Sequence, residues 1–135
     1  MKIIQFIPSL NSGGAERFVV DLSNSLATNH KVYLFTLLDI NEHGFYKSDV
    51  CENVELISLN KKLGVNLLLP IKIFFKLRKI KPDIVHTHLS PIFYLFLCFF
   101  TLKKSIYFHT IHSDASKEAK SKFGYFIKLF LFKSK

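Results

Sequence analysis

The chain has 135 residues, of which 49% are hydrophobic and 21% charged, and its formal net charge is +9. This length suits one domain that buries roughly two-thirds of its unfolded surface, and the composition argues against intrinsic disorder. The basic charge favours an anionic partner, which could be nucleic acid, an anionic membrane, a phosphate-bearing substrate or an acidic protein.

Two cysteines, Cys51 and Cys98, lie far apart, and neither has the spacing of a zinc ligand. A disulfide framework and structural zinc are therefore not expected, and a reducing cytoplasmic compartment is the default. The first residues lack the apolar core of a signal peptide. The longest apolar run, residues 91–102, is about a dozen residues, whereas a membrane span needs roughly 20, so no transmembrane helix is expected.

Hydrophobic periodicity predicts strands that alternate with helices. The expected strands cover residues 2–8, 31–37, 54–59, 83–88 and 105–111. The expected helices cover residues 14–28, with Phe18, Val19, Leu22 and Leu26 on one face, and residues 67–80, 91–102 and 116–133, while 41–48 form a polar loop. This order predicts an α/β fold, a parallel sheet with helices on both faces. Because no strand follows residue 133, we expect the chain to stop inside its own fold.

In a sheet of this kind, ligands bind at the carboxyl ends of the strands. The segments that follow those ends are residues 8–14, 38–42, 87–91 and 110–114. Motifs in these segments are the candidates for a functional site.

The first candidate is the stretch Ser12-Gly13-Gly14-Ala15-Glu16-Arg17, which joins a strand to a helix. Glycine lets the backbone approach a ligand, and the first helical turn offers unpaired N–H donors and a positive dipole. The stretch matches neither GxGxxG nor GxxxxGK[ST], so a phosphate contact and a plain tight turn both remain open. Glu16 would stabilise the helix through the dipole in the second case.

Histidines gather at two expected strand ends. His86 and His88 alternate along one strand and therefore share a face, where they could bind a metal, pack with polar contacts or touch substrate. No third metal ligand is evident. His112 follows the strand that contains His109, and it is either a residue over the ligand crevice or a surface loop histidine. The sequence shows no pattern of a nucleophilic or glycoside hydrolase.

Basic residues form two clusters. The first lies in the expected helix 67–80 and at its end, and consists of Lys72, Lys76, Arg78, Lys79 and Lys81. The second, Lys120–Lys133, interleaves lysines with aromatic residues. The second segment is either an interfacial membrane helix or a buried helix whose lysines reach outward. No spacing typical of a nucleic-acid-binding motif occurs, so nucleic acid is not an expected partner.

Three stretches in this order resemble the N-terminal domain of GT-B fold glycosyltransferases of family 4. They are residues 3–10 with Gly13-Gly14-Ala15-Glu16-Arg17, residues 81–88 (KPDIVHTH) and His109-Thr110-Ile111-His112. The resemblance covers nearly the whole chain, and the combination is more specific than any single piece. It implies a Rossmann-like domain that holds the acceptor, facing a second domain that holds the sugar nucleotide.

The resemblance also implies roles for individual residues. The glycine loop at Gly13 and Gly14 would approach the donor diphosphate, and His112 would lie by the reaction centre as the catalytic candidate. The remaining substrate-binding candidates are Glu16, Arg17, His86, His88 and Ser113. The family generally needs no metal and no cofactor, since the sugar nucleotide is a substrate, and it is mostly configuration-retaining.

The sequence lacks the donor-binding residues of the family's C-terminal domain, including its paired-glutamate motif. We therefore expect an acceptor-side domain or fragment that transfers sugar to a glycan or lipid-linked acceptor only when a donor-binding domain completes it. Surface-polysaccharide or glycolipid assembly in the cytoplasm, at the inner face of the membrane, is the expected setting. The alternatives are the acceptor-binding subunit of a split enzyme and a small flavodoxin-like nucleotide-binding or membrane-docking module.

Overall fold

The computed structural model describes residues 1–62, 66–89, 94–102 and 104–112. The strands are β1 (Lys2–Ile7), β2 (Lys31–Thr36), β3 (Val54–Ser58), β4 (Ile84–His88) and β5 (Ile106–Thr110). The helices are α1 (Gly14–Leu26), α2 (Leu69–Ile80) and α3 (Phe96–Thr101), with a short 3₁₀ helix at Lys47–Asp49. Strands and helices alternate along the chain as predicted.

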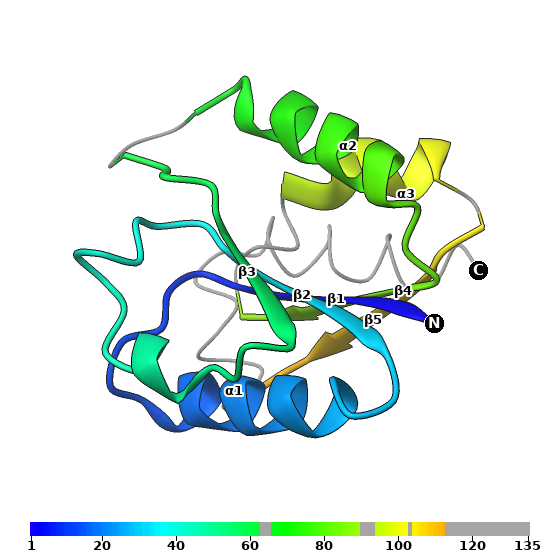
Figure 1. The fold of residues 1–135 in the computed structure, drawn as a ribbon. Coiled ribbons are helices and arrows are strands. Elements are labelled where there is room, and N and C mark those ends of the chain that lie inside the picture. Colours follow the sequence, from blue (N-terminus) through cyan, green and yellow to red (C-terminus); the bar gives the residue numbers. More distant parts are fainter. Residues whose placement is uncertain (63–65, 90–93, 103, 113–135) are drawn as a thin grey trace.

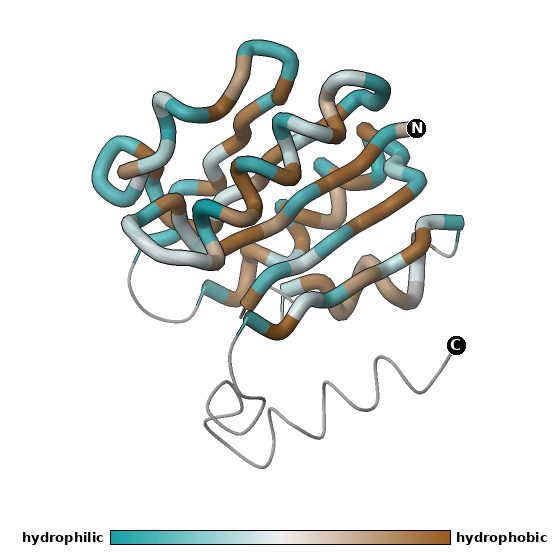
Figure 2. The backbone as a smooth tube through the Cα atoms, turned by 90° about the horizontal axis from the view of Figure 1, so that it is seen from below, coloured by the Kyte–Doolittle hydropathy of each residue, from teal (hydrophilic) through white to brown (hydrophobic). Residues whose placement is uncertain are grey.

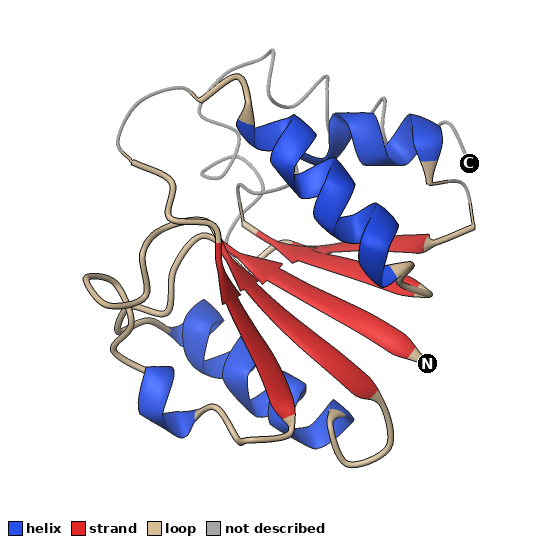
Figure 3. Cartoon of the chain, turned by 45° about the horizontal axis from the view of Figure 1, so that its top comes forward, coloured by secondary structure: helices blue, strands red, loops and turns tan. Residues whose placement is uncertain are grey.

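The strands form one parallel sheet in the order β3-β2-β1-β4-β5. All five therefore point their carboxyl ends toward the same edge, and Figure 3 shows them converging there. The chain builds outward from β1 through β2 to β3, and then crosses back to add β4 and β5 on the other side of β1. This order confirms the predicted α/β class with a Rossmann-like arrangement.

Helices cover both faces of the sheet. In Figure 1, α1 lies below the sheet, and α2 and α3 lie above it. The side chains of β2 show why both layers form. Val32 and Leu34 are buried in the core between the sheet and α1, whereas Phe35 is buried in the core between the sheet and helices α2 and α3. Strands buried on both faces read as near-continuous apolar runs, and Figure 2 shows such hydrophobic stretches along the tube.

The boundaries differ from the prediction in several places. The first helix ends at Leu26 instead of residue 28, and helix 91–102 is reduced to Phe96–Thr101 in the described residues. The predicted polar loop 41–48 contains the start of the 3₁₀ helix. The predicted basic helix 116–133 lies outside the described residues.

Phe18 is a further correction. The sequence groups it with Val19, Leu22 and Leu26 on one face of the first helix, but its side chain is 46% exposed, and the buried residues of α1 are Val19, Val20 and Ser23. In the described part of the chain, no helix has the length and apolar character required to cross a membrane.

Candidate functional site at the carboxyl edge of the sheet

The glycine loop leaves open space in front of α1. Gly13 is the N-cap residue with φ −164° and ψ 159°, an extended conformation that any residue adopts, and Gly14 begins the helix. A Cβ atom added to Gly14 would meet no atom within 4 Å, and one added to Gly13 would meet only the carboxylate end of Glu16. The backbone therefore does not require glycine at either position, which leaves close approach by a ligand as the better explanation.

At Gly44, by contrast, the surrounding backbone does require glycine. A Cβ atom there would collide with the backbone carbonyl of Ile40, so this glycine is required by packing within the loop after β2. That loop braces the glycine loop through two backbone bonds, because the Leu10 N–H donates to His43 O and the Tyr46 N–H donates to Leu10 O, each at 2.9 Å. The space in front of Gly14 is thus held by a fixed backbone.

The two charged candidates on α1 have different surroundings. Arg17 donates to Asp21 (Nε to Oδ2, 3.0 Å) and to Asp49 (Nη1 to Oδ2, 2.8 Å), and its guanidinium lies 5.7 Å from the centre of the Tyr46 ring. Its hydrogen bond and charge interaction with Asp21 raise its pKa further. Arg17 is exposed, so these pairs are solvated and contribute little to stability. The Glu16 carboxylate instead folds back beside Gly13.

A chain of hydrogen bonds connects three elements at the site. The buried side chain of Gln5 on β1 accepts from His88 on β4 (Oε1 to Nε2, 2.8 Å). His88 Nδ1 then lies 2.9 Å from Nε2 of His112, just beyond β5. Because a neutral imidazole carries one N–H, His88 with its proton on Nε2 must accept at Nδ1 from the Nε2–H of His112. The buried amide oxygen of Gln5 therefore sets the tautomer of both rings.

The electrostatics keep His88 neutral. Its side chain is fully buried, and this burial, together with repulsion from His86, His112 and His109, lowers its pKa to about 2. Burial also lowers the pKa of His86, and the charge of His112 adds to that effect. His86 and His88 are thus neutral at physiological pH. The hydrogen-bonded series Gln5, His88 and His112 forms a histidine relay, which suits hydrogen bonding to a polar group such as a hydroxyl.

His86 lies beside this relay. Its ring centroid is 4.0 Å from that of His88, and its Nε2 lies 2.7 Å from the Thr110 hydroxyl oxygen. His109 lies on the opposite face, where its Nδ1 is 2.9 Å from the Thr87 hydroxyl. The strand pattern explains the division, because Thr87 pairs in register with His109 while His88 pairs with Thr110, and successive residues point to opposite faces.

Phe18 joins the glycine loop to the histidines. It lies one turn into α1, four residues after Gly14, and its ring contacts the rings of His112 and His88 edge-on, at centroid distances of 5.4 and 6.2 Å. The half-exposed ring therefore covers the histidine relay and leaves His112 partly accessible.

The structure thus brings His86, His88 and His112 together on the α1 side of the sheet, with Gly13 and Gly14 one helical turn from Phe18. Ser113, the remaining predicted site residue, lies outside the described residues. Both ring nitrogens of His88 are engaged, and among the described residues no group of three or more His, Cys, Asp or Glu side chains could hold a metal ion. Both rings make polar contacts within the protein, His88 with Gln5 and His112, and His86 with Thr110.

Sequence reasoning missed Gln5, Thr110 and the position of Phe18. A signal for Gln5 was present, since it is the one uncharged polar residue in the strand Lys2–Ile7, and a buried polar side chain requires a partner.

A separate pocket of about 300 Å³ lies away from the histidines. Its lining residues are Lys2, Tyr33, Glu55, Ile57, Lys76, Lys79 and Ile80.

Comparison with known proteins identifies the family. No curated protein sequence matches the chain. The family model described as Glycosyltransferase Family 4 matches residues 12–134, a range that begins just before the glycine loop and includes the three histidines. The chain therefore belongs to glycosyltransferase family 4.

Proposed function

We propose that this chain is the acceptor-side half of a glycosyltransferase that transfers a sugar from a sugar nucleotide to a glycan or lipid-linked acceptor. The observation that carries the proposal is the contact of Phe18 with His112, because it joins the open glycine loop to the histidine relay in one site. A diphosphate at the loop and a sugar at His112 would be neighbours in a single sugar nucleotide.

Each group has a chemical role in this proposal. The first N–H groups of α1 lack intrahelical acceptors, and Gly13 has no side chain to cap them, so they suit the diphosphate. His112, oriented by His88, would hydrogen-bond a hydroxyl of the transferred sugar. Glu16 suits a sugar hydroxyl better than a phosphate, because two anions would repel each other.

The other predicted site residues would act around this centre. Arg17 is exposed next to the loop and could exchange one of its carboxylate partners for a substrate phosphate. His86 and His88 would position His112 through their contacts on the sheet. Ser113 would follow His112 at the crevice. We assign no metal and no cofactor to this half.

The proposal requires a donor-binding domain, on the same polypeptide or as a separate subunit of a split enzyme. Either arrangement would make the 135-residue chain inactive by itself. We place the protein in the cytoplasm, in surface-polysaccharide or glycolipid assembly, and the two free cysteines, Cys51 and Cys98, are compatible with a reducing compartment.

The test is nuclear magnetic resonance of the labelled 135-residue chain with millimolar UDP-glucose, UDP-N-acetylglucosamine or GDP-mannose. We expect at least one of them to shift the Gly13 and Gly14 amide signals and the His112 ring signals. Gly14→Val should abolish these shifts without lowering the melting temperature, because the added Cβ atom has open space around it.

The matched control is Phe45→Ala, which removes an exposed side chain from the loop after β2 and should leave the shifts unchanged. Shifts that avoid the glycine loop with all three probes would contradict the proposal. Sugar transfer catalysed by the purified chain alone would contradict the need for a second half.

A further inference from the structure

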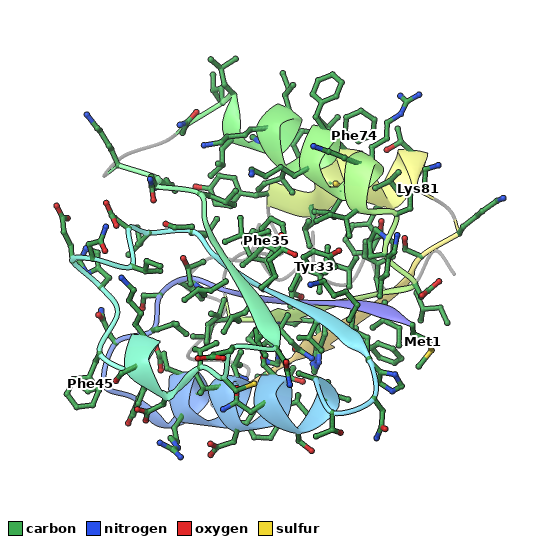
Figure 4. All side chains as sticks on the ribbon, viewed as in Figure 1. Met1, Tyr33, Phe35, Phe45, Phe74 and Lys81 are labelled. Atoms are coloured by element: carbon green, nitrogen blue, oxygen red, sulfur yellow. The ribbon has the colours of Figure 1, made fainter. Side chains whose placement is uncertain are left out.

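Helix α2 has one buried apolar face and also exposes large apolar side chains to solvent. Leu69, Ile73 and Leu77 are buried in the core above the sheet. Figure 4 shows side chains of α2 projecting away from the sheet at the top of the view. The large exposed apolar side chains belong to the helix and to the turn before it. Their exposed fractions are 82% for Leu67, 72% for Leu68, 45% for Ile71 and 62% for Phe75.

Three of these four residues form a stripe along the helix. Leu68, Ile71 and Phe75 have the i, i+3, i+7 spacing that places side chains along one line of a helix. Scattered single apolar residues on a surface need no explanation, but a contiguous stripe marks an interaction site. The core cannot be its partner, because it lies against the other face of the same helix.

A second stripe, of lysines, runs beside the first. Lys72, Lys76 and Lys79 have i, i+4, i+7 spacing, one position further along the helix. Lys76 and Lys79 line the 300 Å³ pocket together with Lys2. Residues 56–82 contain no aspartate or glutamate. Glu55 is the one acidic residue that lines this pocket, against three lysines. The surface therefore combines exposed apolar groups with a flank of net positive charge.

From this arrangement we propose that α2 and the turn before it dock on an anionic lipid surface. The apolar stripe enters the headgroup region, and the lysine stripe contacts lipid phosphates. An amphipathic helix with lysines beside leucine and phenylalanine is the arrangement that such a surface binds. A polybasic flank adds electrostatic attraction to the negative leaflet. The predicted membrane segment at residues 120–133 is not needed for this docking.

The first test measures co-sedimentation of the 135-residue chain with phosphatidylglycerol vesicles and with phosphatidylcholine vesicles. Binding should favour the anionic vesicles and fall as salt rises. The variant Leu68→Ser/Ile71→Ser/Phe75→Ser should lower the partition coefficient by at least about tenfold. Lys79→Gln should lower it about fivefold, the factor expected for one cation near such a surface.

Matched controls come from the other side of the molecule. Phe45 is 68% exposed, and Figure 4 shows it on the far side of the sheet from Phe74 of α2. Phe45→Ser and Lys47→Gln should both leave vesicle binding unchanged. Equal binding to both lipids, or unchanged binding by the triple variant, would overturn the proposal.

A single tryptophan makes the test specific for α2 and does not depend on a triple variant that folds. The sequence contains no tryptophan, so Phe75→Trp and Phe45→Trp each introduce one reporter. Emission from Phe75→Trp should shift to the blue with anionic vesicles and be quenched by brominated acyl chains, whereas Phe45→Trp should not respond. Emission that is already blue-shifted without vesicles and escapes quenching would show that protein covers the stripe, and would overturn the proposal. Neither experiment uses a sugar nucleotide, so their outcome is independent of the proposed transferase function.

Discussion

His88 Nδ1 and His112 Nε2 lie 2.9 Å apart, and this contact joins the buried end of β4 to the first residues beyond β5. His88 is fully buried, and its Nε2 donates a hydrogen bond to the side chain of Gln5 on the central strand. His112 therefore extends from a segment outside the regular structure but takes its orientation from the core. A group held in this way loses little conformational freedom when a substrate binds.

The neutral state of His88 predicts a pH-dependent stability. Its pKa is 6.5 in an unfolded chain and about 2 in the fold. Between these values the unfolded state binds a proton that the folded state does not, so stability is lost as pH falls below 6.5. The loss is about 1.4 kcal/mol for each pH unit, and His86 shifts in the same direction.

Urea unfolding at about pH 7.5 and about pH 5.0 measures this loss, which should reach about 2 kcal/mol. His88→Gln should make the pH dependence shallower, because it removes the buried imidazole that the unfolded chain protonates. If wild type and His88→Gln respond equally to pH, His88 is not a buried neutral group in solution.

Cys98 should be inert in the folded protein. Burial raises the pKa of its thiol to about 12, and its side chain has no exposed surface. The thiolate is the reactive species, so a thiol reagent at mildly alkaline pH should label the half-buried Cys51 first and Cys98 only after unfolding. Mass spectrometry of labelled peptides identifies the site. Comparable labelling rates for both cysteines would contradict the packing of α3 on the sheet.

The end of α2 offers a stabilising substitution. Lys81 adopts φ 54° and ψ 64°, the left-handed conformation, and its N–H closes the helix by donating to Leu77 O. Glycine avoids the steric cost of this conformation, although it also raises the entropy of the unfolded chain. The net effect of Lys81→Gly should be a stabilisation of about 0.5–1 kcal/mol. Lys79→Gly, inside the last helical turn, should destabilise by about 1 kcal/mol instead. Thermal unfolding of both variants checks the contrast, and a loss of stability in Lys81→Gly would contradict it.

The sequence predicts the fold well because its signal is local. The apolar runs around Ile4 and Val85 are buried on both faces of a parallel sheet, and such strands are recognisable from a few adjacent residues. The site is less predictable, because it depends on pairs distant in the chain. Gln5 and His88 are 83 residues apart, and only the register of β1 against β4 brings them together. Periodicity groups Phe18 with the apolar residues of one helix face, but it cannot show that the Phe18 ring contacts histidines of distant strands.

Gln5 provides the sharpest test of the relay, since its side chain is nearly fully buried and its oxygen accepts from His88. Gln5→Met keeps the volume but removes the acceptor, which leaves a buried N–H of His88 without a partner at a cost of about 1–3 kcal/mol. With the acceptor gone, His88 should also lose its preference for a proton on Nε2, and the imidazole nitrogen signals of both His88 and His112 should change. Gln5→Glu restores an acceptor at the same position, so it should retain the Nε2 tautomer even though burying a carboxylate destabilises the fold. Long-range proton–nitrogen spectra of the three proteins report the tautomers directly. Identical imidazole spectra for wild type and Gln5→Met would show that Gln5 does not orient His112, and any loss of stability would then reflect packing alone.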